Sequence, residues 1–247
     1  MTDTTGGRAA DRLPLALLAY AVALALFLLV PPMLKQSVGP PEWFTLQEAV
    51  DLFTPVVVLP LAWAVLAQAG AVCRRGVVAF IVIAIVWVEG QGIHLAANAI
   101  GDAFDTSVRD AFYATPAGDL DHWLDEVLSH WIWHAAYVAL AVLIFWHGRA
   151  AAPGRGRAAW ATAAFAGFVY GLVFFIVTVE GGTAALGIPA SIGFLAWAAR
   201  EARRGPRDRA VVTFFVAGSF LALIAYAGWA AINHGTLPGF YDVGLIK

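Results

Sequence analysis

Histidine and carboxylate side chains recur at helical spacing in one short stretch of this chain, residues 87–137. His130 and His134 are four residues apart, a spacing that lets two imidazoles on one helix face bind a single metal ion. Glu126 extends the pattern to Glu-x3-His-x3-His, and His94 on an earlier segment could supply a third nitrogen. Three imidazoles with a carboxylate and no thiolate suit Zn, with Fe, Mn and Cu as alternatives. The stretch therefore indicates a divalent transition-metal site.

Other polar residues of the same stretch are candidates for the rest of such a site. The acids are expected to complete the metal shell or to act as general base towards a water that the metal activates. The candidate metal-ligating acids are Glu126 and Asp102, and the candidate catalytic acids are Glu126, Glu89 and Asp125. Uncharged polar groups are expected to surround the shell and fix the imidazole tautomers. These residues are Gln91, Asn98, Ser129 and Tyr137.

Two consecutive helices must position these groups, one predicted over 76–104 and one over 120–148. Spacings of three and four residues put each set on one helix face. The two helices are antiparallel neighbours, so their polar faces can oppose each other. Counted from the cytoplasmic boundaries, His94 and His130 lie about 4 Å below the outer boundary of the hydrocarbon layer. Glu89 and His134 lie about 10 Å below it by the same count.

The composition places both helices in a membrane. The chain has 247 residues, of which 61% are hydrophobic and only 13% charged, which is typical of an integral membrane protein. About 20 apolar residues span the hydrocarbon layer, and seven segments qualify. They are residues 13–33, 46–70, 76–104, 120–148, 158–180, 183–203 and 210–233. We therefore predict an all-α integral membrane protein, with a short tail over 1–12 and one seven-helix domain over 13–247.

The distribution of basic residues predicts the orientation of these helices. If the N-terminus is cytoplasmic, twelve of the 15 Lys and Arg residues fall on the cytoplasmic side. Only Lys35, Arg109 and Lys247 then lie outside. This bias follows the positive-inside rule, so we expect a cytoplasmic N-terminus and an outer C-terminus. The polar site would face the periplasm if the membrane is a bacterial inner membrane.

Groups from three further helices are expected to reach the same outer end. Asp51, Glu180 and His234 fall at the outer rim by the same depth count. The roles of His122, Glu180 and His234 stay open between rim hydrogen bonding and direct participation. Ionisable groups in hydrocarbon are costly and mark functional sites, so the convergence supports a site more strongly than any single motif does.

Two classes of function fit this cluster. The first is a membrane-embedded metalloenzyme acting on a lipid or other apolar molecule, with hydrolysis favoured slightly over oxidation. The second is a transporter or a conduit for protons or metal ions that uses the same groups. A haem- or metal-binding sensor without catalysis is a third reading. The inner halves of the two helices read VVAFIVIAIV and VALAVLIF, and this apolar wall favours a one-sided site over a conduit. A homo-oligomer is compatible with the sequence, and no nucleic-acid partner is expected.

In a few residues the set resembles the seven-helix membrane metallohydrolases, which include alkaline ceramidases and progestin/adiponectin receptors. That resemblance would imply a zinc site built from His130, His134, His94 and an acid. In that family the His-x3-His lies on the last helix, and Gly90 stands here where the family has serine, so the likeness is one of chemistry. A retinal protein is excluded, because the only lysines are Lys35 and Lys247.

Overall fold

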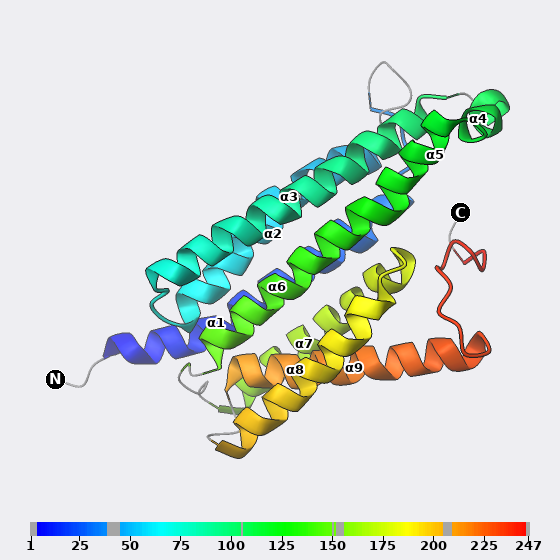
Figure 1. Cartoon of the computed structure of the whole chain (residues 1–247). Helices are drawn as coiled ribbons and strands as arrows, with labels where there is room; N and C mark the ends of the chain where they lie inside the picture. The colour runs from blue at the N-terminus through cyan, green and yellow to red at the C-terminus, as the bar shows by residue number, and fades with distance from the viewer. Residues whose placement is uncertain are drawn as a thin grey trace.

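The computed structural model describes residues 4–38, 45–104, 106–149, 151, 156–204 and 209–245, and none of them lies in a β-strand. The protein is a bundle of long helices that run back and forth along one direction (Figure 1). The long helices are α1 (Thr4–Leu29), α2 (Leu46–Ala69), α3 (Arg74–Asp102), α6 (His130–Gly148), α7 (Gly156–Glu180), α8 (Ala184–Arg204) and α9 (Ala210–Ile232). Each predicted segment is thus helical, and the all-α prediction is confirmed.

Short helical pieces lie at the end of the bundle where α3 finishes and α6 begins. They are η1 (Pro31–Met33), α4 (Thr106–Tyr113), α5 (Pro116–His122) and η2 (Trp123–Ser129). The last of these is π-helical and runs directly into α6. Its i→i+5 hydrogen bonds widen the helix, and such turns are frequent at functional sites.

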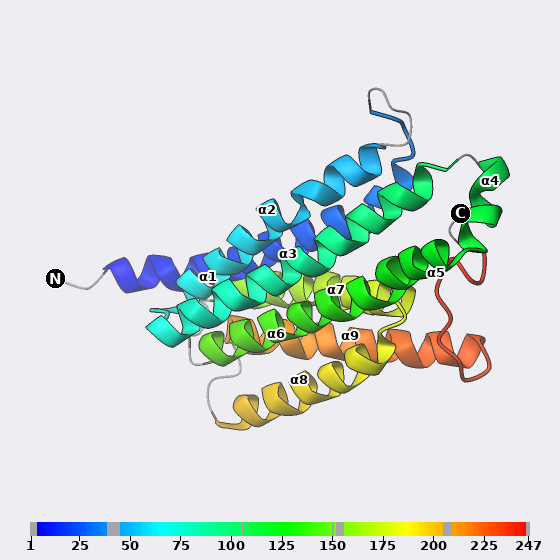
Figure 2. The same cartoon turned by 45° about the horizontal axis from the view of Figure 1, so that its top comes forward.

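Six segments of the described chain are long and apolar enough to cross a membrane. They are Arg12–Met33, Leu46–Ala69, Arg74–Gly101, Pro116–Gly148, Gly156–Glu180 and Ala210–Ile232. The predicted segment 183–203 forms α8, which has the length of a membrane span but is not among these six segments. Apolar helices of this kind are consistent with an integral membrane protein. The start of α1 and the end of α9 lie at opposite ends of the bundle (Figures 1 and 2).

Small residues allow close packing of α7 against α9. A Cβ atom placed on Gly171 would collide with the backbone of Gly218. The glycines let the two backbones approach, as in many membrane helix pairs. Gly167 faces the carbonyl of Phe214 in the same way, so both glycines serve close packing.

Aromatic side chains fill the interior of the bundle between α1, α3, α6 and α7. Trp87, Tyr137, Tyr170 and Tyr20 are each at most 3% exposed. Their rings form a contiguous series, with centroid separations of 5.4 Å for Trp87–Tyr137, 5.6 Å for Tyr137–Tyr170 and 6.5 Å for Tyr170–Tyr20. This packed interior lies directly beneath the candidate site.

Candidate functional site

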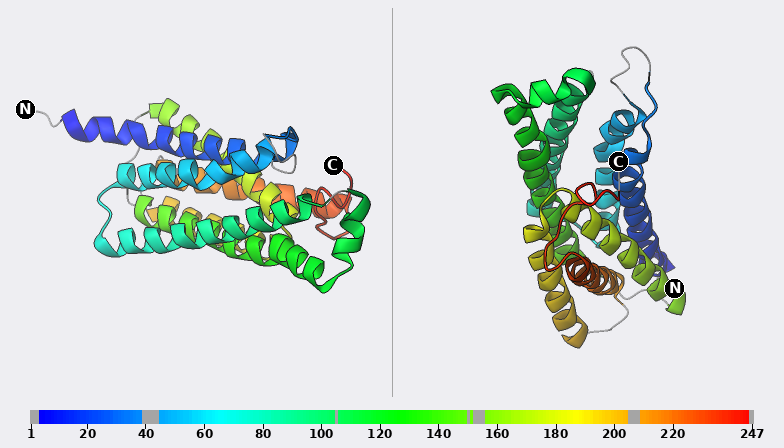
Figure 3. Two further views of the ribbon diagram at one scale, coloured as in Figure 1. Left: turned by 90° about the horizontal axis from the view of Figure 1, so that it is seen from above. Right: turned by 90° about the vertical axis from the view of Figure 1, so that its right-hand side faces the viewer.

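A cavity of about 670 Å³ opens at the end of the bundle where α3 finishes. Its walls come from the ends of α1 and α7, from η1 and η2, from α2 and α3, and from the start of α6. The segment that follows α9 lies over this end (Figure 3), and Phe240 of that segment lines the cavity. The volume is in the range of ordinary small-molecule sites.

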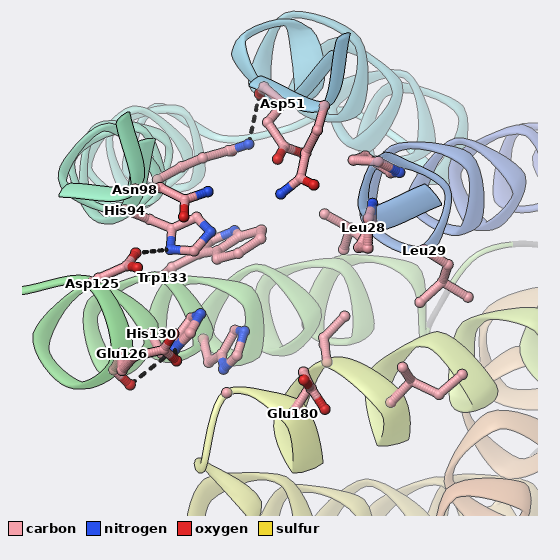
Figure 4. Close-up of a pocket in the computed structure, with 18 of the residues that line it drawn as sticks. Leu28, Leu29, Asp51, His94, Asn98, Asp125, Glu126, His130, Trp133 and Glu180 are labelled. Atoms are coloured by element: carbon pink, nitrogen blue, oxygen red, sulfur yellow. Dashed lines mark hydrogen bonds and ion pairs between the residues drawn. The ribbon is translucent and has the colours of Figure 1, made fainter. Parts of the chain in front are cut away.

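The three predicted histidine ligands lie together on one wall of this cavity (Figure 4). Ring centroids are 5.0 Å apart for His94 and His130, and 5.5 Å apart for His130 and His134. Exposure falls along the row, from 20% for the His94 side chain to 9% for His130 and 1% for His134. The imidazoles thus form a row that enters the protein, with His130 in the middle.

Each imidazole of the row is held through its Nδ1 atom by a different oxygen. His94 Nδ1 lies 2.6 Å from the Asp125 carboxylate. His130 Nδ1 lies 3.0 Å from the backbone oxygen of Glu126, which can only accept, so Nδ1 carries the proton in neutral His130. With Nδ1 occupied as a donor, the acceptor lone pair of the neutral ring is on Nε2.

The third imidazole is held from a different helix. His134 Nδ1 lies 2.6 Å from Thr183 Oγ1, and this hydroxyl also lies 3.4 Å from the backbone oxygen of Thr178. Since the hydroxyl donates to that carbonyl, it accepts from His134. Thr183 had no recognisable signal in the sequence, because it follows a Gly-Gly turn 49 positions away from His134.

The two acids of the π-helical turn η2 lie differently around the imidazole row. A regular helix would place Glu126 on the stripe of His130 and His134, with Asp125 beside it. In the structure Asp125 is the acid that pairs with His94. The Glu126 side chain is 48% exposed at the cavity mouth, with its carboxylate 4.0 Å from His130 Nδ1. Both predicted acids therefore line the cavity, but Asp125 is the one engaged with an imidazole.

Gln91 and Asn98 line the cavity as expected, but Gln91 does not contact a histidine. Its side chain accepts a hydrogen bond from Trp87 Nε1 at 3.0 Å and donates one to the Asp51 backbone oxygen at 2.8 Å. Gln91 is 2% exposed, so this connection is a buried link between α2 and α3. The role that the sequence indicated, fixing an imidazole tautomer, is carried by other groups.

Several predicted site residues lie away from the cavity. Glu89 is exposed on α3 and is not part of the lining. Ser129 is buried and its hydroxyl donates to the Asp125 backbone oxygen. Tyr137 packs beneath the site, against Trp87 and other aromatic rings. The side chain of Asp102 lies outside the described residues, although its backbone ends α3.

Of the residues expected at the outer rim, some line the cavity and others do not. Asp51 and Glu180 line the cavity, whereas His234 does not. His234 lies after α9 with a positive φ of 55°, in a turn. His122 packs edge-on against Tyr113 and is also absent from the lining.

Two further lining residues, Trp133 and Gly181, lie against the imidazole row. The Trp133 ring lies 5.3 Å from His134, 6.3 Å from His94 and 6.5 Å from His130 by centroid. A Cβ on Gly181 would lie 2.7 Å from His134 Cε1. The end of α7 therefore packs its backbone onto the row, and only glycine leaves room.

The side chains do not form a complete metal shell in this arrangement. Among the described residues, no group of three or more His, Cys, Asp or Glu side chains is positioned to hold an ion. Adjacent members of the row are nonetheless near the separation expected for shared ligation. Two imidazoles with Nε2–metal distances of about 2.0–2.1 Å and tetrahedral angles have ring centroids roughly 5 Å apart.

Compared with known protein families, curated proteins and solved structures, the chain shows no significant match.

Proposed function

We propose that this protein is a membrane-embedded, metal-dependent enzyme whose site opens at the outer face of the membrane. The metal would be a divalent transition ion, with zinc favoured over iron, manganese and copper. Its ligands would be His94, His130 and His134, with Glu126 as a carboxylate at the mouth. The substrate would be a lipid or another apolar molecule, and hydrolysis is favoured over oxidation.

The proposed orientation has seven spans, a cytoplasmic N-terminus and an outer C-terminus. At about 1.5 Å per residue the 21 residues of α8 reach the thickness of the hydrocarbon layer. This helix runs beside α9 and ends in Arg203 and Arg204 at the end of the bundle opposite the cavity. Basic residues cluster at that end, as the positive-inside rule requires of the cytoplasmic side. In a bacterium the cavity would then face the periplasm.

The observation that carries the metal proposal is the anchoring of all three imidazoles through Nδ1. His94, His130 and His134 use a carboxylate, a backbone carbonyl and a hydroxyl, respectively. Metal-ligating histidines commonly make such a bond with the nitrogen that does not face the ion, which fixes the tautomer and the ring direction. Three neighbouring histidines sharing this arrangement on one cavity wall support a common ligand for their Nε2 atoms.

The chain's own residues would divide the work of hydrolysis. A divalent ion held by the imidazoles supplies Lewis-acid activation of water or of a substrate carbonyl. Asp125 would stabilise positive charge on His94 through its 2.6 Å contact. The half-exposed Glu126 carboxylate would accept a proton and pass it to solvent. Leu28, Ile176 and Val177 on the other walls would hold the apolar part of the substrate.

Completing the shell requires the imidazoles to turn towards one ion. His130 has a neighbouring imidazole on each side, so small shifts of the flanking rings that keep their Nδ1 contacts would bring the three Nε2 atoms towards one ion. Ligand-free sites commonly tighten when their ligand binds.

Metal analysis of the purified protein tests the proposal. We expect about one bound ion per chain in the wild type and a loss of that ion in the double variant His130→Ala plus His134→Ala. The matched control is His147→Ala, because His147 also bonds a carbonyl four residues earlier but lies at the opposite end of α6. A wild-type protein that takes up no stoichiometric ion from Zn²⁺, Fe²⁺, Mn²⁺ or Cu²⁺ would falsify the proposal.

A proton relay is the second candidate, favoured by the row arrangement of the imidazoles. The spacing of 5.0 and 5.5 Å suits proton exchange through bridging waters. Three buried tyrosines, Tyr137, Tyr170 and Tyr20, form a series of adjacent rings beneath the site. The inner half is therefore less uniformly apolar than the sequence of two helices suggested. Proton flux in vesicles that stops in His134→Ala, without any bound metal in the wild type, would favour this reading.

A further inference from the structure

The charged groups that line the cavity indicate which class of apolar substrate it can bind. Four carboxylates line the cavity, and no described lysine or arginine does. They are Asp51, Asp125, Glu126 and Glu180. A divalent ion held by the three imidazoles would add two positive charges, so the four carboxyl groups still outnumber the added charges and bias the field of the wall towards negative. In a cleft with low-dielectric walls such a field repels anions and concentrates cations.

Three of these carboxylates already have partners within the protein. Asp125 contacts His94 at 2.6 Å. Glu180 accepts a hydrogen bond of 2.5 Å from the Phe240 backbone N–H. Glu126 lies 4.0 Å from His130 Nδ1 and is turned partly to solvent.

Asp51 is the carboxylate that remains. It lies on α2, across the cavity from His130 (Figure 4) and within electrostatic reach of His94. No described residue donates a hydrogen bond to its carboxylate, although Gln91 bonds its backbone oxygen at 2.8 Å. The backbone at Asp51 is therefore fixed through the buried Gln91, while the charged group faces the cavity.

A second observation points to a ligand at the same place. Trp133 lines the cavity and is 8% exposed, and its indole N–H has no hydrogen-bond partner among the described residues. A buried donor without an acceptor is unfavourable. The cavity thus combines a carboxylate that receives no hydrogen bond from a described residue with an apolar wall formed by Leu28, Leu29 and Val177. The indole N–H leaves room for an acceptor atom elsewhere on the ligand.

We infer that the cavity binds an amphiphile with a cationic, ammonium-type polar end, and that Asp51 holds this end. The aliphatic part lies against the ends of α1 and α7. The inference deepens the proposed function, since it names the substrate class of the same cavity. An ammonium donates up to three hydrogen bonds, and its bond to a carboxylate is charge-assisted and short. Phosphate- and carboxylate-headed lipids would meet the same field as repulsion.

A chain-matched ligand series tests this inference. The full-length protein is placed in zwitterionic lipid nanodiscs, and equilibrium binding of tritiated dodecylamine, dodecanol, dodecanoate and dodecyl phosphate is measured with empty nanodiscs subtracted. We expect dodecylamine to bind at least about tenfold more tightly than dodecanol, and the two anions more weakly still. Asp51→Asn should remove most of the amine preference and leave dodecanol binding unchanged, which also shows that the variant is folded.

The control variant is Asp110→Asn. It removes the same charge from exposed α4 at the same end of the bundle, outside the cavity. Equal binding of amine and fatty acid would overturn the inference, as would equal losses in Asp51→Asn and Asp110→Asn. Each measurement is made with and without a chelator. A protein that holds no metal but still prefers the amine would contradict the proposed enzyme and leave the ligand class standing.

Discussion

His134 Nδ1 lies 2.6 Å from Thr183 Oγ1, although the two residues are 49 positions apart and belong to different parts of the bundle. The contact fixes the most deeply buried imidazole of the row. It also ties the start of α6 to the turn between α7 and α8. Any ligand of His134 is therefore coupled to the position of that turn.

Replacing Thr183 by Val should weaken metal binding while preserving the shape of the side chain. The acceptor for His134 Nδ1 is lost, and outer-shell partners of this kind are typically worth about 10–100-fold in metal affinity. Competition with a chromophoric chelator measures the change. Thr183→Ser keeps the hydroxyl and should bind as the wild type does; equal affinities in Val and Ser variants would assign Thr183 a packing role only.

Gly181→Ala should disturb the row by sterics alone. The new Cβ would lie 2.7 Å from His134 Cε1 and 3.0 Å from His130 Cγ, so the rings must move, at a cost of about 1–3 kcal/mol. We expect a lower midpoint of thermal unfolding and weaker metal binding. Gly193→Ala on α8 is the control, because a Cβ added there would meet no atom within 4 Å, and a gain of up to about 1 kcal/mol is expected.

Gln91→Met should loosen α2 from α3. Methionine matches the length of glutamine but leaves Trp87 Nε1 without its acceptor and the Asp51 backbone oxygen without its donor. Unsatisfied buried groups cost about 1–3 kcal/mol. Thermal unfolding and dodecylamine affinity should both fall, the latter because Asp51 loses its support. Gln68→Met, at the other end of α2, should change neither; an unaltered Gln91→Met protein would show that the link does not stabilise the helix pair.

The proposed orientation can be read from the single native cysteine. Cys73 is exposed in the short turn between α2 and α3, at the end of the bundle away from the cavity. A membrane-impermeant maleimide should label it in intact cells only after permeabilisation. In the Cys73→Ser background, Thr236→Cys should be labelled without permeabilisation, since Thr236 is exposed after α9. The reverse pattern would invert the topology and place the cavity in the cytoplasm.

The helical segments were predictable from the sequence because a hydrocarbon layer imposes a length and a composition on each of them. Only α8 deviates, since Gly187 and Pro189 lower its apolar character. Gly187 lies against Tyr226 and Thr178, so its small size reflects packing within the bundle. A glycine that is required by contacts with other helices cannot be recognised from a single sequence.

The grouping of the three histidines in one cavity agrees with the prediction from helical spacing, and the predicted acids Glu126 and Asp125 line the same cavity. Spacing could not predict that Asp125 is the acid in contact with His94, because residues 123–129 are π-helical and a π turn leaves no clear mark on residue types. Asp51 was placed at this end of the bundle by the depth count and lines the cavity, whereas the contact of Thr183 with His134 depends on tertiary packing that spacing does not reveal.

The position of Trp133 gives the protein an internal optical reporter. Its indole lies within 6.5 Å of all three imidazoles by centroid. A paramagnetic ion such as Cu²⁺ or Co²⁺ at the row would quench its emission at contact range, whereas diamagnetic Zn²⁺ would not. A Trp133→Phe variant isolates this signal from the other nine tryptophans. Fluorescence titration could thus follow occupancy of the cavity in an unlabelled protein.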